Sequence, residues 1–242
     1  MSTEWVMPKI LVLSVTYSGK DYCLDEWIDN CNLFTYPNYD HIMIDNTDDG
    51  GKYLESIRPK LENAGIMCYH TERGDTSREA LARSQNLGRR IMLEGDYDYM
   101  FSLESDIFPK KNIMEALIRH NQMFISGIYC IGELNNRSRT LCLTVDTENK
   151  DTGTIGTVLL SPSQSLDYIN KGLKEVSASG MGCTLIHREI LEKVAFTYIQ
   201  GHRAHSDVFF CNSARRLGYM VIADTDVFCD HKNQSWVGFE KR

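Results

Sequence analysis

The sequence predicts an α/β protein with a mainly parallel central sheet and helices on both of its faces. In the first half of the 242-residue chain, short apolar, β-branched segments alternate with helix-sized amphipathic ones. Strands joined by crossovers of that length pair in parallel, and the crossover helices cover the sheet. Polar residues gather where the strands end, which is where open α/β sheets bind ligands.

The strands expected in the first half are short apolar runs that turn polar at their ends. The first, KILVLSVTYS, is rich in β-branched residues, the second leads into an acidic loop punctuated by glycines, and the fourth ends in two acids. In order, these strands are 9–18, 41–45, 66–72, 97–106 and 124–131.

The helices expected between these strands show apolar residues at helical spacing and recognisable ends. Gly65 stops the second helix, which Pro59 could interrupt. Thr76 or Ser77 caps the third helix, and Gly95 ends it. In order, these helices are 20–34, 52–65, 75–95 and 111–120.

The second half of the chain predicts a mixed arrangement. Residues 132–161 look like hairpins and loops, and residues 167–196 hold a glycine pair, a strand and a helix. A helix over 207–217, a turn at Gly218, a strand and a closing histidine follow. Because no repeat, low-complexity tract or linker interrupts the chain, residues 1–242 are expected to form one domain, with 132–242 completing a site begun by 1–131.

Composition argues against several classes of protein. The formal net charge of −7 gives no general attraction to nucleic acid or anionic membrane. The eight cysteines are scattered and form no CxxC pair, which predicts reduced, buried thiols rather than a zinc site or a disulfide framework. The first residues lack a signal-peptide pattern, and no apolar run has the length of a membrane span, so a cytoplasmic protein is expected.

Two carboxylates, Glu104 and Asp106, stand one residue apart at the end of a predicted strand. Residues at i and i+2 of an extended segment project to the same side, where two acids can share a divalent cation such as Mg²⁺ or Mn²⁺. The alternative is a cap for the following helix. Pro109 and two lysines separate the acids from that helix, and Asn112 would cap it better.

Two further residues are candidates for the same site. His231 follows the last predicted strand, and its imidazole could complete a Mn²⁺ shell, although a lone histidine is more often structural. Asp207 opens the last predicted helix. It could act as a general base facing the strand ends, or be a helix N-terminal acid favoured by the dipole.

Four blocks of sequence, in this order and spacing, resemble the GT-A fold glycosyltransferases, especially the family 2-like group. The first joins ILVLSVTYS to DHIMIDNTDDG, and the second is ARSQNLGRRIMLEGDYDYMFSLESDIFP. The third is VSASGMGCTLIHREILEKVAF, and the fourth is SDVFFCNSARRLGYMVIADTDVFCDH. The resemblance spans nearly the whole chain and implies a Rossmann-like α/β/α sandwich with a mixed C-terminal half.

The resemblance also implies roles for residues. Glu104, Ser105 and Asp106 match the D-x-D segment that binds metal and diphosphate, and His231 matches a late metal or diphosphate ligand. Asp207 matches the base of inverting members. In a retaining enzyme it would only orient the donor. The nucleotide-sugar would be held by Thr16, Tyr17, Asp45 and Asn46, with Gly180, Met181 and Gly182 forming the turn that faces the acceptor.

Three departures from the family pattern bear on these roles. Glu104 is longer than aspartate by a methylene and could reach the ribose or a metal-bound water instead of the ion. Gln85 replaces an arginine, so either a nearby arginine such as Arg78 or Arg83 supplies positive charge to the diphosphate, or no residue does. Ser206 replaces the acid before Asp207, which removes a like-charged neighbour that could raise its pKa.

The function implied is transfer of a sugar from a nucleoside-diphosphate sugar, with a UDP-sugar favoured, to an acceptor hydroxyl with the help of Mn²⁺ or Mg²⁺. The acceptor stays open among a glycan, a small molecule and a modified nucleic-acid base. Residues 132–156, with Asn135, Asn136, Arg137 and Arg139, could roof its site or form a solvated hairpin. The alternatives are a sugar-nucleotide nucleotidyltransferase, which SVTYSGKDYC fits poorly because it lacks a glycine-rich basic loop, and an inactive nucleotide-sugar-binding module.

Overall fold

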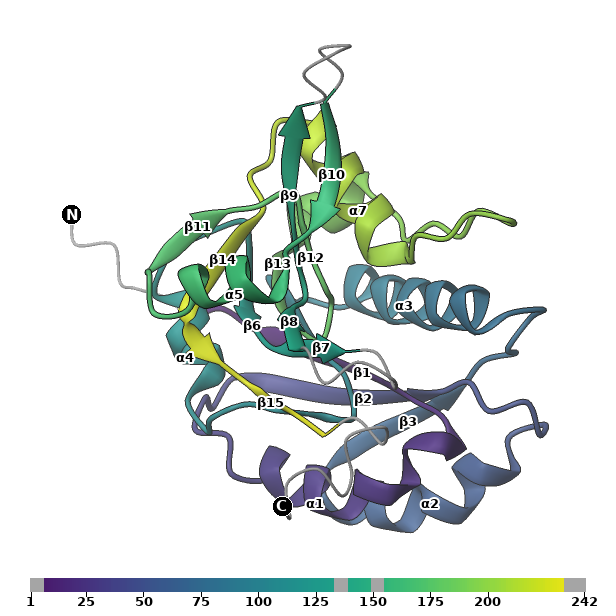
Figure 1. Cartoon of the computed structure of the whole chain (residues 1–242). Coiled ribbons are helices and arrows are strands. Elements are labelled where there is room, and N and C mark those ends of the chain that lie inside the picture. The colour runs from purple at the N-terminus through teal and green to yellow at the C-terminus, as the bar shows by residue number, and fades with distance from the viewer. Residues whose placement is uncertain (1–6, 133–138, 149–154, 233–242) are drawn as a thin grey trace, which may run out of the picture.

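An eight-stranded sheet forms the centre of the computed structural model, which describes residues 7–132, 139–148 and 155–232 (Figure 1). Pairing is parallel among β3, β2, β1 and β4 and between β6 and β14, whereas β13 and β11 run antiparallel to their neighbours. The predicted mainly parallel sheet with a mixed second half is therefore confirmed. In spatial order the strands are β11 (Leu173–Glu175), β14 (Ile222–Phe228), β6 (Phe124–Ile128), β13 (Cys183–His187), β4 (Tyr99–Leu103), β1 (Ile10–Thr16), β2 (Tyr39–Asp45) and β3 (Ile66–His70).

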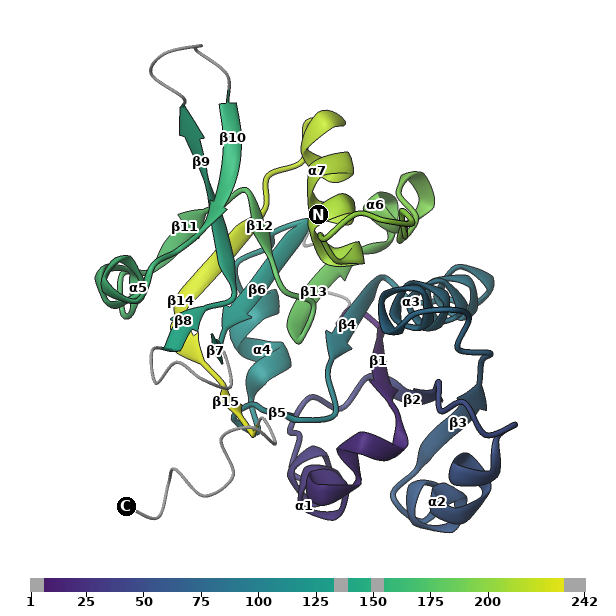
Figure 2. The same ribbon diagram turned by 45° about the vertical axis from the view of Figure 1, so that its right-hand side comes forward.

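Helices cover both faces of this sheet (Figures 1 and 2). Alternate residues of β1 show why: Ile10 and Val12 pack on one side, with α1, α2 and α4, while Leu11 and Leu13 pack on the other, with α3, α6 and α7. A strand buried on both faces needs the continuous apolar run that its sequence provides. The helices are α1 (Asp21–Cys31), α2 (Lys52–Asn63), α3 (Ser77–Glu94), α4 (Ile113–Ile118), α5 (Pro162–Tyr168), α6 (Arg188–Lys193) and α7 (Ser206–Arg216).

Local signals in the sequence account for the ends of several helices. Of the two predicted N-caps, Thr76 and Ser77, the structure uses Thr76, whose hydroxyl accepts a hydrogen bond from the Glu79 N–H at 3.1 Å. Pro59 lies inside α2 without ending it. A short 3₁₀ turn, η1 (Ser18–Lys20), joins β1 to α1 and brings Lys20 to the end of the sheet.

Two very short strands, which the sequence did not predict, hold the last described segment of the chain in place. β5 (Ile107–Phe108) follows the acid pair, and β15 (Asp230–His231) pairs with it in antiparallel register, His231 opposite Ile107. This pairing returns the last described segment to the end of β4 (Figure 2). It therefore decides which residue faces Asp106.

Two smaller sheets stand beyond the main sheet, the first beside α7 and the second between α5 and β15 (Figures 1 and 2). One is the hairpin of β9 (Leu143–Glu148) and β10 (Ile155–Leu159) with β12 (Ala178–Ser179), and the other pairs β7 (Cys130–Gly132) with β8 (Arg139–Leu141). Asn135, Asn136 and Arg137, named above as a roof for the acceptor, lie outside the described residues, as does the Arg139 side chain.

Candidate functional site

The acid pair follows β4 directly and is held by neighbours on three sides. The Glu104 N–H donates to the Gly182 carbonyl at 3.1 Å, and the Trp27 indole N–H donates to the Glu104 carbonyl at 3.1 Å. Ser105 is fully buried, and its hydroxyl donates to the Val15 carbonyl at 3.1 Å. Ser105 thus fixes the end of β4 to β1, and its side chain is turned into the protein interior.

His231 meets Asp106 although 125 residues separate them. Its Nε2 lies 3.3 Å from Asp106 Oδ2, and its Nδ1 lies 2.7 Å from the Cys130 carbonyl oxygen. The Lys232 N–H donates to the Asp106 carbonyl at 2.9 Å, so backbone and side chain are both tied to the acid. With 8% and 5% of their side-chain surfaces exposed, His231 and Asp106 form a nearly buried pair.

Lys20 is the third member of this cluster, and the sequence did not assign it a role. Its Nζ lies 2.5 Å from Asp106 Oδ2 and 4.0 Å from Glu104 Oε2. The side chain retains 19% exposure, so it borders open space while it touches the buried acid. A phosphate-binding loop is rich in glycine, whereas the short turn that carries Lys20 has a single glycine, Gly19. The sequence therefore offers no motif by which to predict a role for Lys20.

The two acids differ in their electrostatic environment. Burial opposes ionisation of Asp106, but the hydrogen bond to His231 and the charge of Lys20 outweigh it and lower the pKa of Asp106. Burial also raises the pKa of Glu104, with the Asp106 charge adding to it and Lys20 opposing it. The contacts with Asp106 raise the pKa of both His231 and Lys20 despite their burial. Asp106 is therefore the firmly ionised acid.

A divalent cation fits the chemistry of this cluster only in part. Asp106 Oδ1 is buried and has no hydrogen-bond partner in the structure, which leaves one carboxylate oxygen for a cation. Within the described ranges, no three His, Cys, Asp or Glu side chains are already placed to hold a metal. Mg²⁺ and Mn²⁺ usually bind through one or two carboxylates and substrate phosphates, so Asp106, His231 and Glu104 suit a site that the substrate completes.

Two cavities meet at this cluster. One, about 290 Å³, is called here the donor-side cavity. The other, about 340 Å³, is called the acceptor-side cavity. They share Leu81, Glu104 and His205, so Glu104 stands at their junction, with the buried Asp106 two residues further along the chain. The residues lining only the donor-side cavity are Val15, Thr16, Tyr17, Lys20, Asn46, Arg73 and Ser77.

The predicted nucleotide-binding residues divide into two groups. Thr16, Tyr17 and Asn46 line the donor-side cavity, with the Tyr17 ring 39% exposed. Asp45 is fully buried, and its carboxylate is bonded within the protein: Thr47 donates both its N–H and its hydroxyl to Oδ1, and His70 Nδ1 lies 3.0 Å from Oδ2. Asp45 therefore shapes the loop after β2.

The arginine that lines the donor-side cavity is Arg73, which the sequence did not single out. Its guanidinium lies 5.9 Å from the centre of the Tyr17 ring. Arg83 instead pairs with Glu79 at 2.6 Å, and Arg78 lies partly buried in the first turn of α3 with its Nε buried and unpartnered among the described residues. Position alone favours Arg73 for contact with a ligand in this cavity.

Asp207 lies in the first turn of α7 and lines the acceptor-side cavity. Its Oδ1 accepts a hydrogen bond from the Val208 N–H at 2.7 Å. Burial raises the pKa of Asp207 in spite of that bond. An acid at position 206 would have raised the pKa of Asp207. That acid is absent, but burial raises the pKa of Asp207 in its place.

The two other departures from the family pattern, Gln85 and Ser206, contact each other. The Ser206 hydroxyl donates to Gln85 Oε1 at 2.5 Å, and both residues are 2% exposed. Gln85 lies on α3 and Ser206 begins α7, so a neutral hydrogen bond joins the two helices. Gln85 therefore contacts α7 and does not line the donor-side cavity.

The glycine turn between β12 and β13 packs tightly against Tyr129. A Cβ on Gly180 would overlap the Tyr129 hydroxyl and lie 2.5 Å from Cys142 Sγ. The Gly182 N–H donates to that same hydroxyl at 3.1 Å. Gly180 lines the acceptor-side cavity, whereas Met181 is 2% exposed and belongs to the hydrophobic core.

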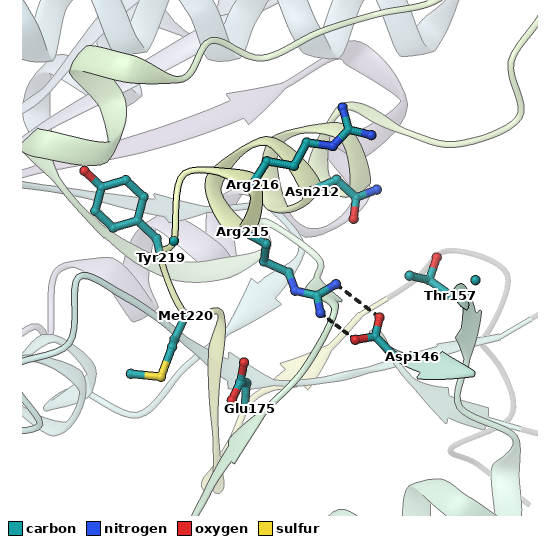
Figure 3. Close-up of a pocket in the computed structure, with 10 residues that line it drawn as sticks. Asp146, Thr157, Glu175, Asn212, Arg215, Arg216, Tyr219 and Met220 are labelled. Atoms are coloured by element: carbon teal, nitrogen blue, oxygen red, sulfur yellow. Dashed lines mark hydrogen bonds and ion pairs between the residues drawn. The ribbon is translucent and has the colours of Figure 1, made fainter. Parts of the chain in front are cut away.

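A larger groove, about 620 Å³, lies at the other end of α7, between that helix and the β9–β10 hairpin (Figure 3). Arg215 spans it and pairs with both oxygens of Asp146, at 2.5 and 3.1 Å. None of the residues predicted for the site lines this groove. The smaller cavities at the strand ends, where unpaired and charged groups converge, are the better candidates for chemistry.

Comparison with known proteins identifies the fold. No family model matches the sequence, and no curated protein matches it. One solved structure that it resembles is the crystal structure of GalNAc-T7 with UDP, GalNAc and Mn²⁺, with a TM-score of 0.63 and 13% sequence identity. The match covers 94% of this chain and 44% of the other, so this chain spans less than half of that protein. The chain has the GT-A fold that its sequence predicts.

Within the part of the chain that the structure describes, no helix has the length and apolar character that a membrane crossing needs.

Proposed function

We propose that the protein is a metal-dependent glycosyltransferase that moves a sugar from a nucleoside-diphosphate sugar to an acceptor hydroxyl. The observation that supports this most directly is the position of Asp106. Its unpartnered oxygen is buried beside Glu104, which lines both cavities, and its partner His231 lines the acceptor-side cavity. A diphosphate between a nucleoside and a sugar needs charge compensation at such a junction.

In this proposal the donor-side cavity takes the nucleoside. Thr16, Tyr17 and Asn46 offer a hydroxyl, an aromatic face and an amide, and Arg73 adds a positive charge above the Tyr17 ring. The fold neighbour was crystallised with UDP, GalNAc and Mn²⁺, which favours a UDP-sugar as the donor. When bound by Asp106, His231 and Glu104, a divalent cation would neutralise the charge that develops on the departing diphosphate.

The acceptor-side cavity then holds the transferred sugar and the attacking hydroxyl. Asp207 lines it and would remove the proton of that hydroxyl as it attacks the anomeric carbon. Its raised pKa brings it nearer to that of an efficient base at neutral pH. In this role the product has the inverted anomeric configuration, which product analysis by NMR measures.

The test is a screen of UDP-, GDP- and CMP-sugars by thermal shift, with and without Mn²⁺, followed by turnover of the sugar that binds. We expect a UDP-sugar to raise the melting temperature in the presence of Mn²⁺ and nucleoside diphosphate to be released. Consumption of nucleoside triphosphate would instead identify a nucleotidyltransferase. Donor binding without turnover over a broad acceptor panel would identify an inactive binding module. Full activity in excess EDTA would refute the metal's role.

Asp106→Ala provides the matched test of the site. It removes the ionised acid at the junction, and we expect turnover to fall by at least about 100-fold, the size of effect seen when one electrostatic group of a transition-state site is lost. Far-UV circular dichroism verifies that the fold is retained. Unchanged donor hydrolysis in this variant would contradict the assignment.

A further inference from the structure

The ammonium group of Lys20 stands where a cation bound to the acid pair would stand. Its Nζ lies 2.5 Å from Asp106 Oδ2 and 4.0 Å from Glu104 Oε2. His231 Nε2 approaches the same Oδ2 at 3.3 Å. Two positively charged or donating groups therefore already contact one carboxylate oxygen, while the second oxygen, Oδ1, has no partner among the described residues.

The Lys20 backbone is held by hydrogen bonds, whereas its side chain borders the donor-side cavity and is 19% exposed. The Lys20 N–H donates to the Tyr17 carbonyl at 2.8 Å, and the Cys23 thiol lies 3.5 Å from the Lys20 carbonyl oxygen. Beyond the backbone, a flexible four-carbon stem carries the charge. Because Lys20 also lines the donor-side cavity beside Tyr17 and Arg73, its ammonium can turn from Asp106 toward a ligand there without a change in the fold.

We propose that Lys20 is a resident counter-ion that holds the place of the divalent cation until the donor arrives, and then pairs with the diphosphate. The inference rests on the proposed function, because it assigns the diphosphate to the junction of the two cavities. It makes binding of metal and binding of donor mutually dependent. Each then increases the affinity for the other by the same factor, as thermodynamic linkage requires.

The physical reason is repulsion between cations at short range. Like charges this close repel, so a metal ion held between Asp106 and Glu104 and the Lys20 ammonium cannot occupy the same position. Without a donor, the ion must displace Lys20 into the donor-side cavity, where the one carboxylate among the described lining residues is Glu104, itself a candidate ligand of the ion. With a donor, the phosphate oxygens supply a new anionic partner for Lys20 and the remaining ligands for the ion.

Lys20 contacts both acids in the space that an ion bound between them would need. In the described part of the chain, no three ligating side chains are arranged around an ion, although Asp106, Glu104 and His231 are close to one another in the fold. The salt bridge fills the space between the acids with an ammonium group. An empty acid pair would be strained by repulsion, and Lys20 relieves it in the donor-free protein.

The test is the affinity of the full chain for Mn²⁺, read from the electron paramagnetic resonance signal of free Mn²⁺, with and without UDP. Lys20→Met removes the charge and keeps the stem. We expect it to bind Mn²⁺ alone roughly 5- to 150-fold more tightly than the unaltered protein, and to lose most of the gain in Mn²⁺ affinity on addition of UDP. Lys20→Arg keeps a counter-ion and should bind Mn²⁺ alone as weakly as the unaltered protein.

Lys232→Met is the matched control, because Lys232 lies beside the cluster but pairs with Glu26 instead of the two acids. It should leave the dependence of Mn²⁺ binding on UDP unchanged. Equal affinities of the unaltered protein and Lys20→Met for Mn²⁺ alone would overturn the inference. If UDP still strengthened Mn²⁺ binding in both proteins, the proposed function would stand. If UDP binding were the same in Mn²⁺ and in EDTA, both would fail.

Discussion

The buried hydrogen bond between Gln85 and Ser206 yields a quantitative prediction about how α3 and α7 are held together. Gln85→Leu keeps a similar volume but removes the oxygen that accepts the Ser206 hydroxyl at 2.5 Å, in a place where both residues are 2% exposed. A buried polar group left without a partner destabilises a protein by about 1–3 kcal/mol. At about 2–4 °C per kcal/mol for a chain of this size, a central value of 2 kcal/mol lowers the melting temperature by about 4–8 °C.

A double-mutant cycle isolates this interaction. Ser206→Ala should also destabilise, whereas Gln85→Leu with Ser206→Ala removes both polar partners and should be less destabilising than the sum of the two single changes by at least about 1 kcal/mol. The free energies of unfolding are measured by urea denaturation, with equal m-values as the check that the unfolded states match. A double variant whose loss equals the sum of the single losses would refute the idea that this bond joins the helices.

Three further predictions test the acceptor side of the site and the hairpin beside it. Asp207 must be ionised to act as base, so the rate should fall as pH drops through its raised pKa, with the acidic limb above the ordinary aspartate pKa near about 4. A pH–rate profile that stays flat down to that value would contradict this role. Gly180→Ala forces a Cβ to 2.5 Å from Cys142 Sγ and should destabilise by about 1–3 kcal/mol in urea denaturation, and an unchanged midpoint would show that the turn is not tightly packed. Arg215→Ala breaks an ion pair whose side chains are 30% and 43% exposed, and it should lower the free energy of unfolding by no more than about 1 kcal/mol. A larger loss in urea denaturation would mean that the hairpin depends on this pair.

The sequence predicted the main sheet well because its strands carry their own signal. The first four residues of β1, Ile10 to Leu13, are apolar and pack alternately into the two layers of helices, and Thr76 with Glu79 marks the start of α3. The strands β5 and β15 were missed because two residues have no periodicity. α5 was missed although Ser161 and Gln164 form a capping box at its start, so that signal was present in the sequence.

The site shows where local patterns stop being informative. The pair Glu104 and Asp106 is visible as a spacing, but its distance to His231 depends on the pairing of β5 with β15, which only the folded chain defines. Gln85 and Ser206 could be noted separately as departures from a family pattern, while their contact across α3 and α7 could not. Lys20 lacks any motif, because a single lysine after a strand is common.

The two acids of the pair are not equivalent, and their surroundings favour different tasks for them. Asp106 is 5% exposed, contacts two cationic side chains and has a lowered pKa, so it stays charged and suits a cation. Glu104 keeps 29% exposure, borders both cavities and has a pKa that burial raises. Glu104 is therefore the less firmly ionised of the two acids, and it is placed to contact a ligand in either cavity as well as the ion.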